Sequence, residues 1–173
     1  MRKENVILRD SDGLTVTGAK TRHQGVELEG GWSITDTLML SGAVSWAVHE
    51  YDFNGGAGAG SERIREGARI DTAPEWLSSL RLLWRPVESV LVETEWAHVG
   101  EYYADAGNTA VYDGHDLFHM RLSKDIDDQT RISLGVRNLL DERYAERADF
   151  AFGRYRYFPG EGRTISVSAG WSF

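Results

Sequence analysis

One segment near the end of the chain combines aromatic rings with guanidinium groups. No Asp or Glu stands between residues 150 and 160. Rings can stack on a flat ligand, while guanidinium groups make cation–π contacts and charge-assisted hydrogen bonds with anions. We therefore expect this segment to bind an anionic aromatic or chelate ligand, the alternative being a structural loop that packs against its neighbours. The predicted ligand-binding residues are Phe150, Phe152, Arg154, Tyr155, Arg156 and Tyr157, with Tyr102 and Tyr103 as weaker candidates on the same outer face.

Two other patterns suggest metal binding or catalysis, but their spacing does not support either. His115 and His119 are four residues apart, which on a strand separates the side chains by about 13 Å. Two pairs of glutamates at i, i+2 lie on one polar strand face, where solvated charge is expected rather than acid–base catalysis. These pairs are Glu27 with Glu29 and Glu93 with Glu95. We predict no catalytic residue, no metal site and no cofactor, and the chain is not expected to be an enzyme.

Size and composition exclude further classes of protein. The chain has 173 residues, a formal net charge of −8 and no cysteine. Nucleic acid is not an expected partner, because phosphate contacts need clustered Lys and Arg, whereas here the basic residues are dispersed among acids. No run approaches the eighteen or so apolar residues of a transmembrane helix, which excludes a helical membrane protein but leaves a β-barrel open.

The segments that must position these residues alternate apolar and polar side chains with a period of two, which is typical of strands. In the last of them, Ile165, Val167, Ala169, Trp171 and Phe173 alternate with small or polar residues. We predict an all-β fold, one antiparallel meander of seven to eight strands. The predicted strands are residues 25–32, 38–48, 76–84, 90–99, 117–123, 131–139 and 164–173, with 6–8 as a short eighth piece.

The connections between these strands are unequal in a regular way. Residues 33–37, 85–89 and 124–128 are short turns rich in Pro, Asp and Ser. Residues 50–74, 100–115 and 141–163 are several times longer. Short turns on one side and long loops on the other are typical of barrels in the bacterial outer membrane.

Tryptophan placement also indicates a membrane. Trp76 and Trp84 are roughly 26 Å apart along one strand, or roughly 20 Å in height at a tilt of about 40°, close to the apolar band of such a barrel. Trp32 and Trp171 fall near the short turns, with Trp46 and Trp96 near the long loops. The expected lipid-facing residues are Val26, Leu28, Leu80, Leu82, Ile132, Leu134, Ile165 and Val167, with Glu27, Glu29, Arg81, Arg121 and Arg137 on the concave side.

Three short motifs resemble those of TonB-dependent outer-membrane receptors of the siderophore-receptor type. Residues 138–144 (NLLDERY) and 160–164 (GEGRT) look like the two elements that close such a receptor. Residues 21–29 (TRHQGVELE) resemble a strand well upstream of its C-terminus, and the chain ends on an aromatic residue, Phe173. The motifs stand in the same order and at similar spacing as in that family, so the resemblance covers nearly the whole chain.

The resemblance implies a function in the outer membrane. A receptor of this family binds a ferric siderophore or another scarce nutrient and imports it with energy relayed by TonB, which grips an N-terminal plug. Residues 1–173 would then be the C-terminal part of the barrel, without the plug and early strands, so that the expected object is a receptor fragment that does not transport alone. Phe173 resembles the signal read by the outer-membrane assembly machinery, and membrane lipid is the remaining expected partner.

Two alternatives remain open at this stage. The first is a complete eight-stranded structural barrel, which requires residues 1–8 to form a full strand paired with the last one. The second is a soluble lipocalin-like binder with its apolar face turned inward around a ligand. Alternation alone does not distinguish an inward from an outward apolar face.

Overall fold

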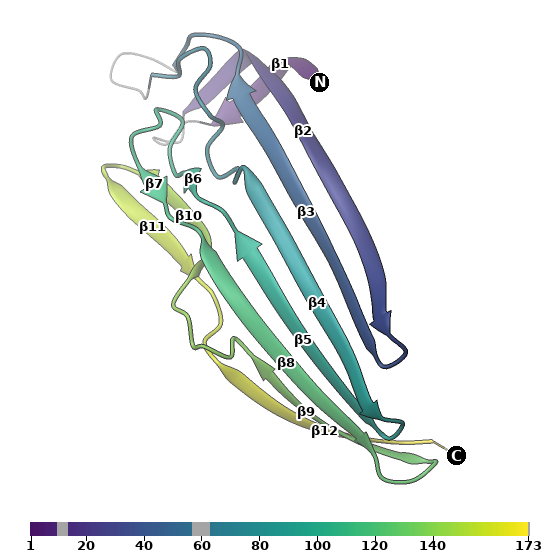
Figure 1. Ribbon diagram of the computed structural model, residues 1–173. Helices are drawn as coiled ribbons and strands as arrows, with labels where there is room; N and C mark the ends of the chain where they lie inside the picture. The colour runs from purple at the N-terminus through teal and green to yellow at the C-terminus, as the bar shows by residue number, and fades with distance from the viewer. Residues whose placement is uncertain (10–13, 57–62, 173) are drawn as a thin grey trace.

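The computed structural model describes residues 1–9, 14–56 and 63–172, and within these ranges it is built of strands, turns and loops. Eight strands form one open antiparallel sheet in the order β1, β2, β3, β4, β5, β8, β9, β12 (Figure 1). No helix in the described ranges is long and apolar enough to cross a membrane. The strands of this sheet are β1 (Arg2–Arg9), β2 (Thr15–Thr35), β3 (Leu38–Tyr51), β4 (Trp76–Val87), β5 (Val90–Val99), β8 (His115–Asp125), β9 (Thr130–Arg137) and β12 (Thr164–Trp171).

The structure confirms the predicted antiparallel meander. The seven predicted strands correspond to β2, β3, β4, β5, β8, β9 and β12, paired in that order. Strand β2 is longer than predicted, because its polar first part pairs with β1 from Arg2 opposite Arg22 to Arg9 opposite Thr15. Strand β9 ends at Arg137, before the predicted residue 139, because Asn138 has a φ of 49° and turns the chain.

The sheet does not close within the described residues. Strand β1 pairs only with the beginning of β2 and lies at the opposite end of the sheet order from β12. The alternative of a complete eight-stranded barrel needed β1 to pair with the last strand, and the register shows that it does not. Phe173, the last residue of the predicted strand 164–173, lies outside the described residues.

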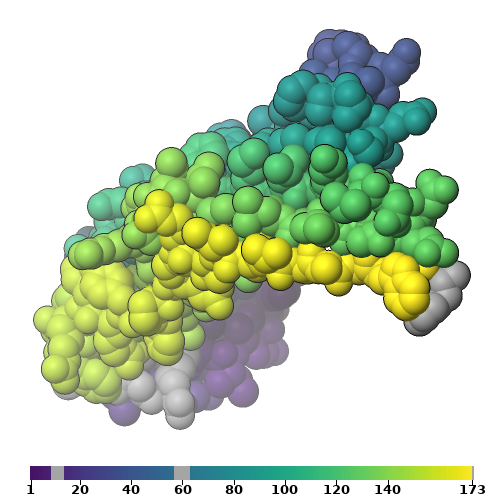
Figure 2. Space-filling model, turned by 90° about the horizontal axis from the view of Figure 1, so that it is seen from below, coloured from purple at the N-terminus to yellow at the C-terminus, as the bar shows by residue number. Residues whose placement is uncertain are grey.

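The register assigns each side chain of the sheet to one of two faces. Leu82 lies between Leu40 and Thr94, and Leu134 lies opposite Val167, so the apolar set shares one face. On the other face Arg81 contacts Glu95 at 3.3 Å. A hollow of about 460 Å³ opens on this polar face, and Figure 2 shows the sheet bent into an arch. Charged and imidazole side chains that line the hollow are Arg81, Glu93, Glu95, His119, Arg121 and Arg137.

No protein layer formed by the described residues covers the apolar face of the sheet. Leu28 is 65% exposed and Val167 is 73% exposed, although both lie in the middle of their strands. A large exposed apolar surface of this kind marks contact with a membrane or a partner. Since the hollowed face is polar and the apolar face is open, the arrangement agrees with a lipid-facing exterior and contradicts the lipocalin-like alternative.

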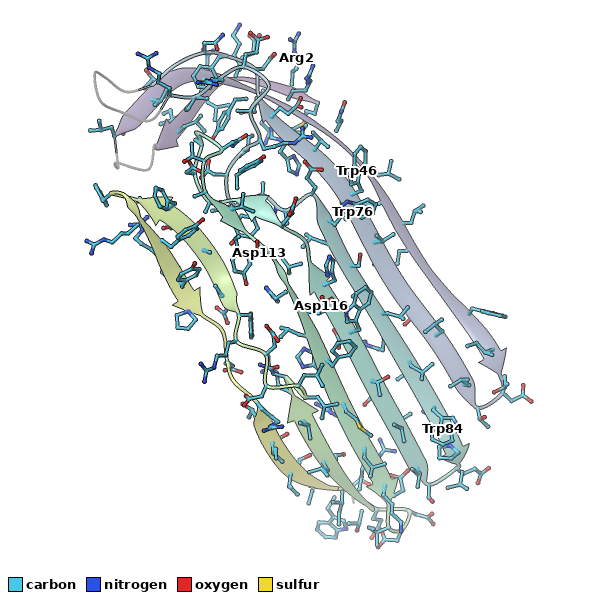
Figure 3. The ribbon with its side chains drawn as sticks, turned by 60° about the vertical axis from the view of Figure 1, so that its left-hand side comes forward. Arg2, Trp46, Trp76, Trp84, Asp113 and Asp116 are labelled. Carbon is cyan, nitrogen blue, oxygen red and sulfur yellow. The ribbon has the colours of Figure 1, made fainter. Side chains whose placement is uncertain are left out.

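Aromatic residues border this apolar face at both ends. Trp46 and Trp76 lie opposite each other near the long connections, with ring centroids 6.3 Å apart, and Trp84 lies at the short-turn end (Figure 3). Indole rings favour membrane interfaces, because the ring is apolar and its N–H requires a polar partner. Asp116, at the loop end of the same face, accepts a hydrogen bond from Trp96 Nε1 at 2.7 Å.

The two closing motifs meet where β9 and β12 leave the sheet. The Asn138 side chain donates to the Glu161 carbonyl at 3.0 Å, and the Arg163 amide donates to Asp141 Oδ1 at 2.9 Å. The Tyr144 ring lies directly on Gly160, where a Cβ atom would stand 2.1 Å from Cζ of the ring. The motif residues therefore anchor the last long connection to the sheet.

The two faces predict opposite effects for the same substitution at neighbouring positions. Leu80→Arg should destabilise the assembled sheet by about 2–4 kcal/mol, because it puts a charge on the lipid face near mid-membrane. Ser79→Arg, one residue away on the polar face that also carries Glu29, should change stability far less. Urea titration of the protein assembled in lipid vesicles measures both; equal losses for the two variants would contradict the assignment of the faces.

Candidate ligand-binding site

The long connections fold together into a compact region above the sheet, here called the outer cap, formed by the described residues of 51–75, 100–114 and 138–163. It contains β6 (Tyr102–Tyr103), β7 (Val111–Tyr112), β10 (Ala145–Ala151) and β11 (Arg154–Pro159). Among the described residues the hydrophobic core clusters lie here, and one of them also includes Tyr51 at the end of β3. Their buried members are Tyr51, Ile64 and Ala106 in one cluster and Tyr102, Ala145 and Ala148 in the other.

Three tyrosine hydroxyls hold the strands of the outer cap together in the same way. Tyr102 donates to the Ala148 carbonyl at 3.2 Å and accepts from the Ala148 N–H at 2.8 Å. Tyr112 makes the same pair of bonds to Ala145, at 3.3 and 3.1 Å. Tyr155 makes them to Val111, both at 3.2 Å. Each hydroxyl thus satisfies a backbone donor and a backbone acceptor across the gap between β6–β7 and β10–β11.

The environment keeps two of these hydroxyls in the form that the bonds require. Burial raises the pKa of Tyr102 and that of Tyr112 above the ordinary tyrosine value, since a phenolate would be poorly solvated there. Both hydroxyls therefore stay protonated donors at neutral pH.

Arg69 ties the first long connection to the top of the sheet. Its guanidinium contacts Glu50 on β3 and Glu75 before β4, each at 2.6 Å. Asn108 binds the Arg69 backbone on both sides, accepting from its N–H at 2.7 Å and donating to its carbonyl at 2.8 Å. The three long connections therefore support one another instead of standing apart as separate loops.

Strands β10 and β11 form a tight hairpin. Their two-residue loop consists of Phe152 and Gly153, both with positive φ, at 53° and 74°. This backbone is that of a type I′ turn, which joins strands of natural twist. Because side chains alternate between the two faces of the hairpin, Phe150, Tyr155 and Tyr157 lie on one face. Arg154 and Arg156 lie on the other.

The second face of this hairpin is a basic patch, defined by Arg147, Arg154, Arg156 and Phe158 around the carboxylate of Asp149. Asp149 is 6% exposed and receives Arg156 Nε at 2.5 Å and Arg147 at 3.1 Å. Arg147 also lies over the Phe158 ring, 5.6 Å from its centroid. Two of the three guanidinium groups, those of Arg147 and Arg156, share the one carboxylate, so the patch keeps excess positive charge that an anion can offset.

The structure distributes the predicted ligand-binding residues over three places. Arg154 and Arg156 are in the basic patch, and Phe152 is 64% exposed at the hairpin turn. On the opposite face Tyr155 stacks on Tyr157 with centroids 5.7 Å apart. Phe150 packs against the edge of the Tyr155 ring, at 5.2 Å.

The two weaker candidates lie elsewhere. Tyr102 is 8% exposed and its hydroxyl is used within the outer cap. Tyr103 lines a separate hollow of about 570 Å³, whose charged residues are mainly acidic. These charged residues are Glu50, Arg69, Glu75 and Glu101. We therefore centre the candidate site on the basic patch.

Sequence analysis missed the acid within this patch. Asp149 stands just before the acid-free segment, and only the hairpin register brings it opposite Arg156. A turn signal such as Asn-Gly would have predicted that register, but here the first turn position is a phenylalanine, which rarely adopts positive φ.

Comparison with known proteins identifies the family. A family model described as "TonB dependent receptor-like, beta-barrel" matches residues 1–139 of the chain. The chain belongs to this family. TonB-dependent receptors of this type are receptors and transporters of the bacterial outer membrane, not enzymes, and the sequence resemblance is thereby confirmed.

Individual members of the family agree with this assignment. The chain is 26% identical to the metal-pseudopaline receptor CntO of Pseudomonas aeruginosa, over 97% of the chain and 23% of that receptor. Its fold matches the siderophore receptor PiuA of Acinetobacter baumannii with a TM-score of 0.80 at 18% identity, over 98% of the chain and 25% of PiuA. The ferric yersiniabactin uptake receptor FyuA of Yersinia pestis matches with the same TM-score and identity, over 99% of the chain and 26% of FyuA. The chain thus spans about a quarter of these relatives.

The tyrosine hydroxyls give a prediction for the outer cap. Tyr102→Phe should leave the buried N–H and carbonyl of Ala148 unpaired and weaken the contact between β6 and β10 by about 1–3 kcal/mol. Amide hydrogen exchange should show faster exchange at residues 145–151, with the sheet strands unchanged. Tyr103→Phe is the matched control. Unchanged exchange in Tyr102→Phe would mean that its hydroxyl does not hold the cap together.

Proposed function

We propose that this chain forms the C-terminal part of the wall and the outer cap of a receptor that takes up a scarce metal chelate, a ferric siderophore in the first instance. The observation that carries the proposal is the basic patch, in which three arginines and an aromatic ring project from a hairpin above a polar barrel lining. Ferric catecholate and carboxylate chelates are commonly anionic, and catecholates also present aromatic rings, which suits guanidinium and aromatic contacts.

Within the patch, Arg154 is the residue most available to a ligand. Arg147 and Arg156 already bind Asp149, whereas Arg154 lies opposite Ala151 and has no acidic partner among the described residues. Phe152 in the adjoining turn and Phe158 on the same face are 64% and 52% exposed and offer rings for stacking. We assign Arg154 the primary contact with the anion, and Arg156 a second role in holding the patch together through Asp149.

The remaining partners follow from the family. TonB would act through a plug domain, which we assign to another part of the receptor, and Phe173 would present the assembly signal. Uptake therefore belongs to the receptor as a whole, while this chain supplies wall and ligand contacts. A chelate of a metal other than iron is the second candidate, since the relative CntO is named a metal-pseudopaline receptor.

Charge reversal at one arginine tests the proposal. Arg154→Glu should weaken binding of an anionic ferric chelate at least ten-fold, because a charge-assisted contact is worth about 1.5–3 kcal/mol and is replaced by repulsion. Binding of labelled ferric citrate and ferric catecholates to outer membranes that contain the protein measures the effect at equal protein abundance.

The matched control is Arg85→Glu near the short-turn end of β4, on the opposite side of the membrane. It should leave binding unchanged. If Arg154→Glu binds every chelate as well as the unmodified protein, the hairpin has a purely structural role and the ligand contacts lie elsewhere.

A further inference from the structure

Two histidines that are far apart in the sequence face each other near the rim of the barrel wall. His23 on β2 lies opposite His49 on β3, and their Nδ1 atoms are 2.9 Å apart. Both side chains are half-buried, and the ring centroids are 5.0 Å apart. They belong to the polar face, because Glu27 and Ser45 follow them at even intervals and line a hollow on that face.

The position of this pair is at the outer end of the membrane-spanning part. Val26 lies opposite Trp46, which belongs to the aromatic residues that border the apolar face near the long connections. His23 and His49 lie three residues farther toward the outer cap, about 10 Å along the strands. The imidazoles therefore line the passage between the outer cap and the polar interior.

The spacing of the two nitrogens equals that of two ligands on one metal ion. Imidazole binds transition metals at about 2.0–2.1 Å, so two nitrogens at a right angle around the metal are about 2.9 Å apart. The same distance also fits a hydrogen bond in which one Nδ1 keeps its proton. Metal binding then needs only the shift of that proton to Nε2 of the same ring, with no movement of the strands.

A neighbouring hydroxyl can accept the proton of the tautomer that a metal needs. Thr21, which is 3% exposed, places its Oγ1 atom 2.9 Å from His23 Nε2. When Nε2 carries the proton and donates it to Thr21, the lone pair of His23 Nδ1 points to His49. A hydrogen-bond acceptor behind a metal-binding histidine is the common outer-shell arrangement in metalloproteins.

The pair provides only part of a coordination sphere. The described residues contain no group of three or more His, Cys, Asp or Glu side chains placed to hold a metal ion. The nearby charge is positive, since Lys3 on β1 lies opposite Thr21 on β2. A metal bound here must therefore bring further ligands, and an anionic chelator offsets the charge of Lys3.

We propose that His23 and His49 form a two-imidazole site for a divalent transition metal presented in an anionic chelate, with Cu²⁺, Ni²⁺ and Zn²⁺ as the suitable ions. Imidazole nitrogen suits these ions, and Cu²⁺ binds most tightly among the divalent metals of the first row. This site is separate from the basic patch, and its metal affinity does not depend on anion binding by Arg154.

The probe is Cu²⁺–iminodiacetate, an uncharged chelate that leaves coordination positions open for two cis imidazoles. The full chain in detergent micelles should bind one equivalent, and the electron paramagnetic resonance spectrum should contain couplings from two imidazole nitrogens. His23→Ala and His49→Ala should each lower the affinity at least ten-fold. Thr21→Val should lower it by a smaller factor with both imidazoles still bound. Cu²⁺–nitrilotriacetate, which is anionic, should depend on the same two histidines.

His98→Ala, on the outward face, is the matched control and should bind like the unmodified chain. Circular dichroism should show the same strand content in every variant. The Arg154→Glu variant should retain copper binding, which separates this proposal from the proposed uptake function. Equal affinity in the unmodified chain and the His23→Ala/His49→Ala double variant would overturn the proposal, as would a spectrum with a single imidazole.

Discussion

Backbone hydrogen bonding in hydrocarbon is the constraint on which the rest of this structure depends. An unpaired N–H or carbonyl within the bilayer costs several kcal/mol, so a sheet that crosses it must pair all of its strands. Residues 24–35 of β2 and the free edge of β12 have no neighbouring strand within the described parts of the chain. In the membrane these two edges require further strands.

The directions of the edge strands restrict what can fill this gap. Both β2 and β12 run from the outer cap to the short-turn side, since the sheet between them is antiparallel throughout (Figure 1). An antiparallel closure therefore needs an odd number of additional strands. A second copy in the same orientation cannot supply it directly, because its β2 would lie parallel to β12. The similarity to receptors about four times as long agrees with this requirement.

Membrane contact and the proposed ligand recognition belong to two different parts of the molecule. The sheet has its apolar surface on the outside, so lipid takes the place of a core and polar side chains fill the concave face. The outer cap contains its own small cores and joins its strands through tyrosine hydroxyls. A cap supported in this way can hold Arg154 and Tyr157 in place at the hairpin, while substitutions there leave the membrane strands intact.

The sequence was most informative where burial on one face forces alternation. The bounds of β3, β4 and β5 were predicted within a few residues, because each side chain of these strands faces either lipid or the interior. The first part of β2 was missed because it lies above the membrane, where neither face needs to be apolar. The pairing of His23 with His49 spans 26 residues and depends on a register that composition does not specify.

The same limit applied to the candidate site. Sequence pattern located the aromatic and basic residues of the last connection, but not their faces, because Phe152 in the turn gives no hairpin signal. The role of Asp149 follows only from the observed cross-strand pairing with Arg156. The sequence therefore predicts which residue types the last connection contains, whereas the grouping of their side chains into a site depends on the fold.

The central claim is that the apolar face meets lipid and the polar face meets water. The chain has no cysteine, so a single fluorophore can be attached at Leu80→Cys or at Ser79→Cys without other labelling. In vesicles with spin-labelled lipid tails, the label at position 80 should be quenched by lipid and shielded from aqueous iodide. The label at position 79 should show the reverse. The opposite pattern, with position 79 in lipid and position 80 in water, would contradict the account.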